Sequence, residues 1–333
     1  MSLLCEARYL YKAKLSVNRK ALKLVEKLCE NADEYGVLIK KTSRGATLID
    51  AGVRAKGGFQ AGRLITEICL GGYGKVEICP IQYDGLVLPS AFVHTNHPAI
   101  STLGSQFADW QIKHGDYNAI GSGPARALAR KNHELYERID YEDDSDATVL
   151  VLETNAEPPE AVVKKIADDC GVSANKVSLI LVPTTSVAGS TQVSGRIVET
   201  GLHKLVKVGL DPKRVANAYG SAPIAPVHPK FVVAMGRTND SILYAGFAHY
   251  DVAGYTDEKL GHTVERAPSC ASKSYGQPFQ QIFKTAKYDF YKIDPNLFAP
   301  AVVSVCNLDT GCVFRAGKIN IETFKHSIGL KNS

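Results

Sequence analysis

The spacing of apolar residues predicts an amphipathic helix over residues 16–35, SVNRKALKLVEKLCENADEY. Ser16 or Asn18 provides a side-chain oxygen that can cap the first turn, and Gly36 ends the pattern. Four apolar residues recur at intervals of three and four positions and fall on one face of this helix: Ala21, Leu24, Val25 and Leu28. The chain therefore opens with a helix that needs an apolar surface to cover.

The pattern beyond this helix changes three times. From Val37 to about Pro89, short β-type runs such as GVLIK and KVEICPI are separated by glycines, which predicts a twisted sheet with one helix near GRLITEICL. From Pro98 to about Gly209, helical and strand patterns alternate, which predicts helices layered on a sheet. After SAPIAPVHP the chain returns to β-type runs with one helix near residues 277–285.

These patterns predict an α+β fold with two domains. Residues 1–95 together with 226–333 are expected to form a β-rich domain from both ends of the chain. Residues 96–225 are expected to form a second domain, a two-layer arrangement of helices on a sheet.

Composition narrows the class of protein. The chain has 333 residues, and its net charge of +5 comes from 39 basic and 34 acidic residues that are scattered along it, so no polybasic segment indicates nucleic acid or a membrane surface. No apolar run reaches the roughly 18–20 residues of a membrane span. Eight cysteines without a C-x-x-C spacing argue against a zinc ribbon or a disulfide framework. We expect a soluble cytoplasmic protein with reduced thiols.

Residues 195–201, GRIVETG, are the first candidate for chemistry. On a helix over residues 192–208, Arg196 and Glu199 fall opposite the apolar side that Val198 and Leu202 define. A solvated ion pair is one interpretation. However, arginine before glutamate is the less favourable order for helix stability, and the flanking glycines indicate close approach to the backbone. The pattern alone leaves both interpretations open.

The second candidate is GDYNAIGSGPARALAR at 115–130, where Ser122 or Gly123 can cap a helix with Pro124 at its first position. Free amide groups at such a start can bind a phosphate or a carboxylate. No G-K-[ST] follows and the third glycine of a dinucleotide motif is missing, so a simple capped helix remains the alternative.

Other polar clusters are weaker signals. His94 and His97 lack the spacing of zinc-ligand motifs, and no metal is expected. Asp240, in GRTND at 236–240, is expected in a polar loop before a strand, as turn chemistry or as a ligand contact.

Several long segments together resemble one family, the methenyltetrahydromethanopterin cyclohydrolases. The resemblance covers about residues 15–325 and leaves out the first 14 residues. The segments that carry it include LIDAGVRAKGGFQAG at 48–62, HPAISTLGSQ at 97–106, GDYNAIGSGPARALA at 115–129, GRIVETGLHK at 195–204, GRTNDSILYAG at 236–246 and YKIDPNLFAPA at 291–301.

The resemblance implies an enzyme that reversibly hydrolyses N5,N10-methenyltetrahydromethanopterin to the N5-formyl compound, without a metal or redox cofactor. It also implies a homotrimer of two-domain subunits with the pterin in a cleft between the domains. Glu199 and Arg196 match the family's catalytic pair, while Ser122, Gly123, Asp240 and Phe298 are expected to contact the substrate. A pterin- or phosphate-binding relative without activity is the alternative.

Overall fold

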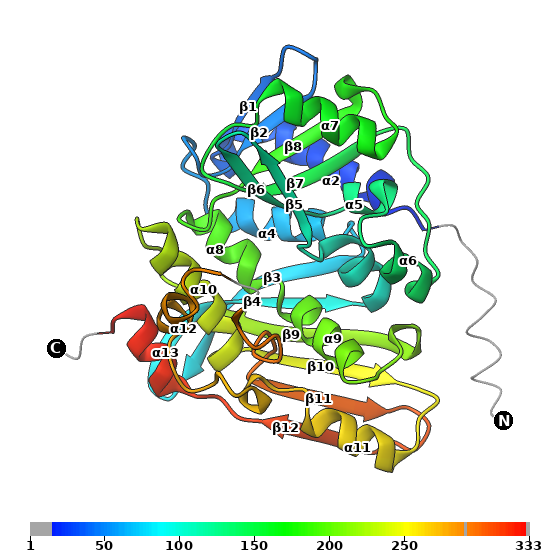
Figure 1. Ribbon diagram of the computed structural model, residues 1–333, viewed down its shortest axis with the longest axis vertical. Coiled ribbons are helices and arrows are strands. Elements are labelled where there is room, and N and C mark those ends of the chain that lie inside the picture. Colours follow the sequence, from blue (N-terminus) through cyan, green and yellow to red (C-terminus); the bar gives the residue numbers. More distant parts are fainter. Residues whose placement is uncertain (1–14, 290–291, 331–333) are drawn as a thin grey trace.

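The computed structural model describes residues 15–289 and 292–330, and within them the strands form two six-stranded sheets (Figure 1). The first sheet has the order β1-β2-β8-β7-β6-β5: Leu38–Lys41, Thr47–Asp50, Val177–Leu181, Thr148–Glu153, Tyr117–Ser122 and Trp110–His114. The second has the order β12-β11-β10-β9-β4-β3: Val313–Gly317, Val302–Asn307, Phe247–Val252, Val215–Pro223, Leu86–Thr95 and Gly74–Tyr83. The predicted α+β class is confirmed.

The helices follow the order α2 to α13 along the chain, and the first begins where the sequence predicts. Ser16 caps α2 by accepting a hydrogen bond from the amide of Arg19. The α-helices are α2 Val17–Glu30, α3 Ala32–Tyr35, α4 Phe59–Cys69, α5 Ala125–Ala129, α6 His133–Ile139, α7 Glu160–Cys170, α8 Val187–Ser194, α9 Ile197–Lys207, α10 Phe231–Ala245, α11 Asp257–Glu265, α12 Phe279–Thr285 and α13 Ile321–Ile328. Shorter turns are the π-helical η1 Ala99–Gln106 and the 3-10 segments η2 Ala174–Lys176, η3 Pro212–Arg214 and η4 Ser269–Ala271.

Helices cover both faces of the first sheet, one layer more than the two layers expected. The reason is visible in β7 and β8, TVLVLE and VSLIL, which are apolar at nearly every position instead of alternating. Val149 and Val151 pack with α2 and α4 in one core, whereas Leu150 and Leu152 pack with α7 in another.

The strands are not divided between the sheets at the expected domain boundaries, 95/96 and 225/226. Strand β2 pairs in parallel with β8, so residues 38–50 belong to the sheet of the middle segment. Strand β9 pairs with β4 and β10, so residues 215–223 belong to the sheet formed by the chain ends. The pairings of β2 with β8 and of β9 with β4 join segments more than 100 residues apart, and local apolar periodicity carries no information about them.

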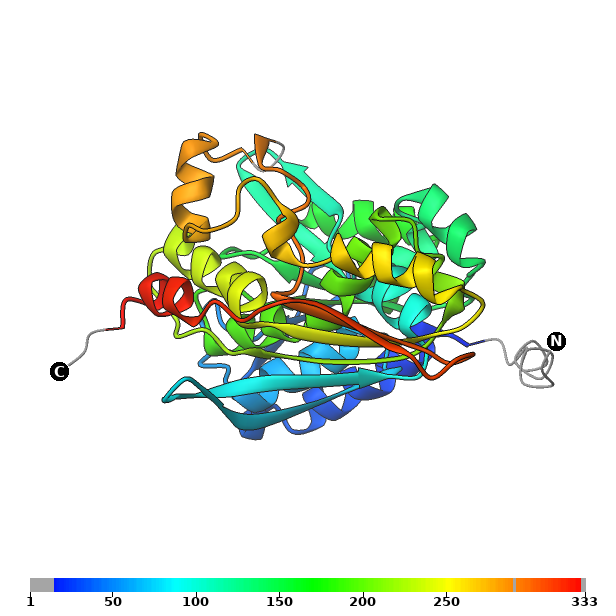
Figure 2. The ribbon, with the colours of Figure 1, turned by 90° about the horizontal axis from the view of Figure 1, so that it is seen from below.

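The second sheet is covered mainly on one face. Figure 2 shows α10, α11 and α12 together on one side of strands β9 to β12. The side chains on that face, such as Tyr250 and Val303, are buried with α9 in the largest apolar core. Helices α12 and α13 pack on α10 through a separate core that contains Phe279 and Phe324. Helices α9 and α10 thereby pack on the second sheet, where both contact β9.

Candidate active site

A cavity of about 900 Å³ lies between strands of the first sheet and helices packed on the second. Strands β5 to β7 of the first sheet supply one wall, and α8 to α10, α12 and the segment after it supply the other. Its polar and charged lining residues include Asp109, Lys113, Asn118, Ser122, Glu153, Asn155, Gln192, Arg196, Glu199, His203 and Lys207. A cavity of this size accommodates a small organic molecule.

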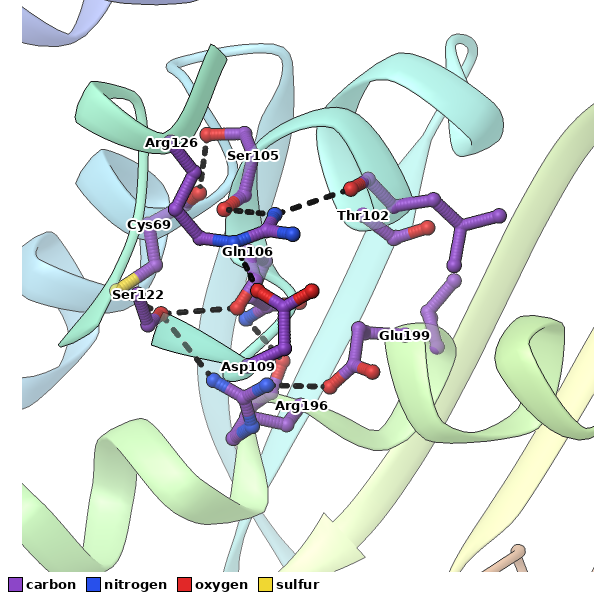
Figure 3. Close-up of polar contacts among 12 residues, drawn as sticks. Cys69, Thr102, Ser105, Gln106, Asp109, Ser122, Arg126, Arg196 and Glu199 are labelled. Atoms are coloured by element: carbon purple, nitrogen blue, oxygen red, sulfur yellow. Dashed lines mark hydrogen bonds and ion pairs between the residues drawn. The ribbon is translucent and has the colours of Figure 1, made fainter. Parts of the chain in front are cut away.

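The predicted pair lies in this cavity. The helix expected over 192–208 is broken at Gly195, so Arg196 precedes the first turn of α9 and Glu199 lies within it. Arg196 Nη2 donates to Glu199 Oε2 at 2.6 Å, and the two side chains are only 12% and 5% exposed (Figure 3). The burial excludes the interpretation as a solvated ion pair.

The flanking glycines serve packing within the protein. A Cβ atom at Gly195 would overlap the side chain of Thr66 in α4, and one at Gly201 would overlap the hydroxyl of Tyr250. The close approach that the sequence indicated is therefore made by neighbouring side chains of the chain itself.

Ser122 fixes the other end of the Arg196 guanidinium. Its Oγ accepts a hydrogen bond from Arg196 Nη1 at 3.2 Å and donates to the carbonyl of Gln106 at 2.8 Å (Figure 3). Gln106 ends the π-helical segment η1, a geometry that often occurs at functional sites. The Sγ atom of Cys69 lies 3.6 Å from Ser122 Oγ, and burial raises the pKa of this thiol to about 11, which makes it a poor nucleophile.

A second ion pair lies beside the first. Arg126 is fully buried, and its Nε donates to Asp109 Oδ1 at 2.5 Å while Nη1 donates to the carbonyl of Leu103 at 3.1 Å. Burial raises the pKa of Glu199, Arg196 and Arg126 oppose the rise, and Asp109 adds to it. Glu199 is thus a carboxylate with increased basicity that is held by one arginine.

Sequence reasoning assigned no role to several polar residues of the cavity wall, among them Asp109, Glu153 and His203. Burial lowers the pKa of His203 to about 4, so this imidazole is neutral near pH 7, and its ring packs on Phe107 with centroids 4.6 Å apart. His203 follows Glu199 by four residues, a spacing that places both on one helix face and could have indicated it.

The other predicted contacts are distributed unevenly. Phe298 lines the cavity and packs edge-to-face on Phe279, with centroids 5.8 Å apart. Among the described residues, those that line the cavity include neither Gly123 nor Asp240. The amide of Gly123 donates to the carbonyl of Ser105, so it is not free to bind an anion. The helix that follows, α5, has only five residues.

Asp240 does not lie in a polar loop, because GRTND is part of α10. Its carboxylate accepts the amide of Phe279 at 2.9 Å and bonds to the hydroxyl of Ser327, which joins α10 to α12 and α13. Thr238 and Asn239 line the cavity, and the 100° step per residue turns Asp240 away from them. A role as a substrate contact does not follow from this position.

Two further properties concern the described residues only. No helix among residues 15–289 and 292–330 is long and apolar enough to cross a membrane. The same part of the chain contains no group of three histidine, cysteine, aspartate or glutamate residues that could hold a metal ion.

Two mixed sheets, with a cavity between strands of the first and helices packed on the second, define an α+β protein whose cavity contains a buried Arg–Glu pair. Residues 16–328 match the model of the cyclohydrolase (MCH) family. The chain therefore belongs to the cyclohydrolase (MCH) family.

Relatives named methenyltetrahydromethanopterin cyclohydrolase are similar over nearly their whole length. The protein of Methanocaldococcus jannaschii is 48% identical over 318 residues, which cover 95% of this chain and 98% of the relative. That of Methanothermobacter marburgensis is 46% identical over 320 residues, with 95% and 100% covered. That of Methylobacillus flagellatus is 43% identical over 318 residues, which cover 94% of this chain and 95% of the relative.

Proposed function

We propose that this chain is a cyclohydrolase that reversibly hydrolyses N5,N10-methenyltetrahydromethanopterin to N5-formyltetrahydromethanopterin. The observation that carries the proposal is the buried Arg196–Glu199 pair, which opens into a cavity of about 900 Å³. The names of the relatives support the substrate and the reaction.

Glu199 is the general base in this proposal. The methenyl carbon lies between two nitrogens that share a positive charge, so it is already electrophilic. Glu199 takes a proton from the attacking water while the C–O bond forms, and then returns that proton to N10 while the C–N10 bond breaks. The second proton of the water leaves from the hydroxyl group as the formyl C=O forms, so one proton is released in each turnover.

Arg196 positions this base and moderates its pKa. The 2.6 Å hydrogen bond to Oε2 fixes the carboxylate, and the bond to Ser122 fixes the guanidinium. The positive charge also keeps the pKa of Glu199 below the value that burial alone would give. Phe298 provides an apolar wall for the pterin.

No metal or redox cofactor enters the proposal, because the substrate cation supplies the electrophile and no electron is transferred. Treatment of the enzyme with EDTA is therefore expected to leave turnover unchanged. A loss of activity that added divalent metal restores would contradict this part of the proposal.

The test follows the methenyl chromophore in the presence of wild type or of Glu199→Gln. We expect the chromophore to disappear rapidly with wild type and about 10²–10⁴-fold more slowly with the variant, since positioned proton transfer accelerates a reaction by this factor. Substrate affinity should change little, because the amide has the shape of the carboxylate. Binding without turnover in the wild type would indicate the pterin-binding relative instead.

The proposal extends to a homotrimer in the cytoplasm. The open face of the second sheet carries aromatic and histidine side chains in ring contact across β4, β9 and β10: Phe92, His94, Tyr219, Phe247 and His249. A half-exposed aromatic strip of this kind supports contact with further copies of the chain. The cysteines among the described residues are free thiols, which supports a reducing compartment.

A further inference from the structure

Glu153 is a carboxylate of the cavity wall that the mechanism above does not use. It is the last residue of β7, and the side chain of Thr184, just beyond β8, donates a hydrogen bond to its Oε1. Strands β7 and β8 run in parallel, so both residues lie at the carboxyl edge of the sheet, where open α/β sheets bind ligands. Burial raises the pKa of Glu153, and the charge of Arg196 opposes the rise.

The register of the strands places Glu153 within reach of a ligand bound at the catalytic pair. Ser122 pairs with Val151, and Ile120 pairs with Glu153. Ser122 and Glu153 are therefore diagonal neighbours on one face of the sheet, about 7–8 Å apart. Since Ser122 holds Arg196, a molecule that places one end at Glu199 can extend its other end towards Glu153.

We propose that Glu153 binds the amino-pyrimidinone edge of the pterin, accepting hydrogen bonds from N3–H and the 2-amino group. The inference rests on the proposed function, because it takes the pterin of that reaction as the ligand. These two donors are adjacent and parallel, and a carboxylate accepts such a pair in the bidentate geometry that it also uses with arginine. The negative charge also complements the methenyl cation.

Neighbouring amides complete the polar lining. Gln192 is buried, lines the same cavity, and its Oε1 has no hydrogen-bond partner among the described residues. Asn118 lies on β6 two residues from Ile120, and Asn155 follows Glu153 by two residues. Their amide groups provide donors for the 4-oxo group, which a carboxylate cannot bind.

This arrangement predicts discrimination against a ligand that lacks the 2-amino group. A site built to accept a hydrogen bond is left with an unpaired buried acceptor when the ligand lacks the donor. The loss of affinity is then larger than the loss of an apolar contact would cause. Glutamine at position 153 has the same shape, but its NH₂ group opposes the pterin donors.

The test compares 6-methyltetrahydropterin with 6-methyltetrahydrolumazine, its 2-oxo analogue, by calorimetry under nitrogen. Wild type is expected to bind the pterin at least about 10-fold more tightly than the lumazine. In Glu153→Gln, pterin binding should weaken about 10–100-fold, while lumazine binding should be retained or become tighter, because the glutamine NH₂ group can donate to the 2-oxo group. The matched control, Glu134→Gln on the exposed part of α6, should retain the wild-type ratio. Thermal unfolding of each variant verifies the fold.

The outcomes separate this inference from the proposed function. If Glu153→Gln keeps the pterin preference, or if wild type has none, the inference is overturned even where the methenyl substrate is hydrolysed. If the preference disappears in Glu153→Gln but wild type fails to hydrolyse the methenyl substrate, the role of Glu153 stands and the proposed reaction is wrong.

Discussion

At the scale of single residues, the pKa of Glu199 decides the pH dependence of the reaction. Burial raises this pKa, so the acidic limb of the hydrolysis rate should lie above the ordinary pKa of glutamate, and the rate should fall as pH decreases through it. Arg196→Gln removes the charge that opposes the rise. We expect the limb to move to higher pH by roughly 1–3 units, and kcat to fall more than KM rises.

Arg196→Lys is the matched control for this prediction. It keeps a positive charge beside Glu199 but loses the fork that binds Glu199 and Ser122 together. Its pH limb should therefore stay closer to that of the wild type, although its kcat decreases. Identical pH limbs for the wild type and both variants would show that Arg196 does not control the ionisation of Glu199.

The same residues show how far a sequence can define a site. The motif GRIVETG made Arg196 and Glu199 candidates for the active site, but the alternation of apolar and polar residues around them also fits a helix face exposed to solvent. Burial decided between the two interpretations, and it comes from the packing of α9 against η1 and against β9 and β10 of the second sheet. Glu153 gave no local signal, because a glutamate at the end of a strand is ordinary in sequence and acquires its role only from the fold.

At the scale of elements, Asp240 joins three helices and makes their association sensitive to pH. Burial raises its pKa to about 8, while hydrogen bonds from Ser327 and the amide of Phe279 oppose the rise. The folded protein therefore keeps this proton up to about pH 8, whereas the unfolded chain loses it near pH 4. The free energy of unfolding should fall with rising pH in this window, by about 1.4 kcal/mol per unit from this group.

Asp240→Asn tests this sign. The amide cannot titrate but retains an acceptor for the amide of Phe279, so the fold should persist. Urea unfolding of wild type and variant from pH 4 to 8 should show the difference in unfolding free energy growing steadily in favour of asparagine. The exposed Asp116→Asn serves as the control and should follow the wild type. A pH-independent difference for Asp240→Asn would contradict the raised pKa.

Elements were easier to predict than their partners. The helix that begins at Ser16 follows directly from its cap and its periodicity. In contrast, GRTND looks like a polar loop but belongs to α10. Its polar side chains find partners there, because Arg237 donates to the carbonyl of Pro226 before the helix and Asn239 donates to the carbonyl of Met235 one turn back in it. The pairing of β2 with β8 depends on contacts between distant segments, so no local pattern could give it.

At the scale of the whole molecule, the open face of the second sheet determines the proposed assembly. Tyr219 is 39% exposed at the centre of the aromatic strip and contacts the rings of Phe92, Phe247 and His249. A lysine at this position would bring like charges close together at a three-fold interface, where a buried unpaired charge is costly. None of the five residues of the aromatic strip lines the cavity, so a substitution in the strip is expected to leave the cavity lining unchanged.

Light scattering of wild type and Tyr219→Lys measures this directly. We expect the wild type to have a molar mass three times the chain mass of 36.0 kDa, and the variant to have the mass of a single chain. Leu38→Lys, at an exposed position of β1 in the other sheet, should remain trimeric. The monomeric variant should unfold at a lower temperature, because association stabilises the folded chain, yet keep measurable hydrolysis because its cavity is intact. A trimeric Tyr219→Lys would place the contact on another face, and a monomeric wild type would refute the trimer itself.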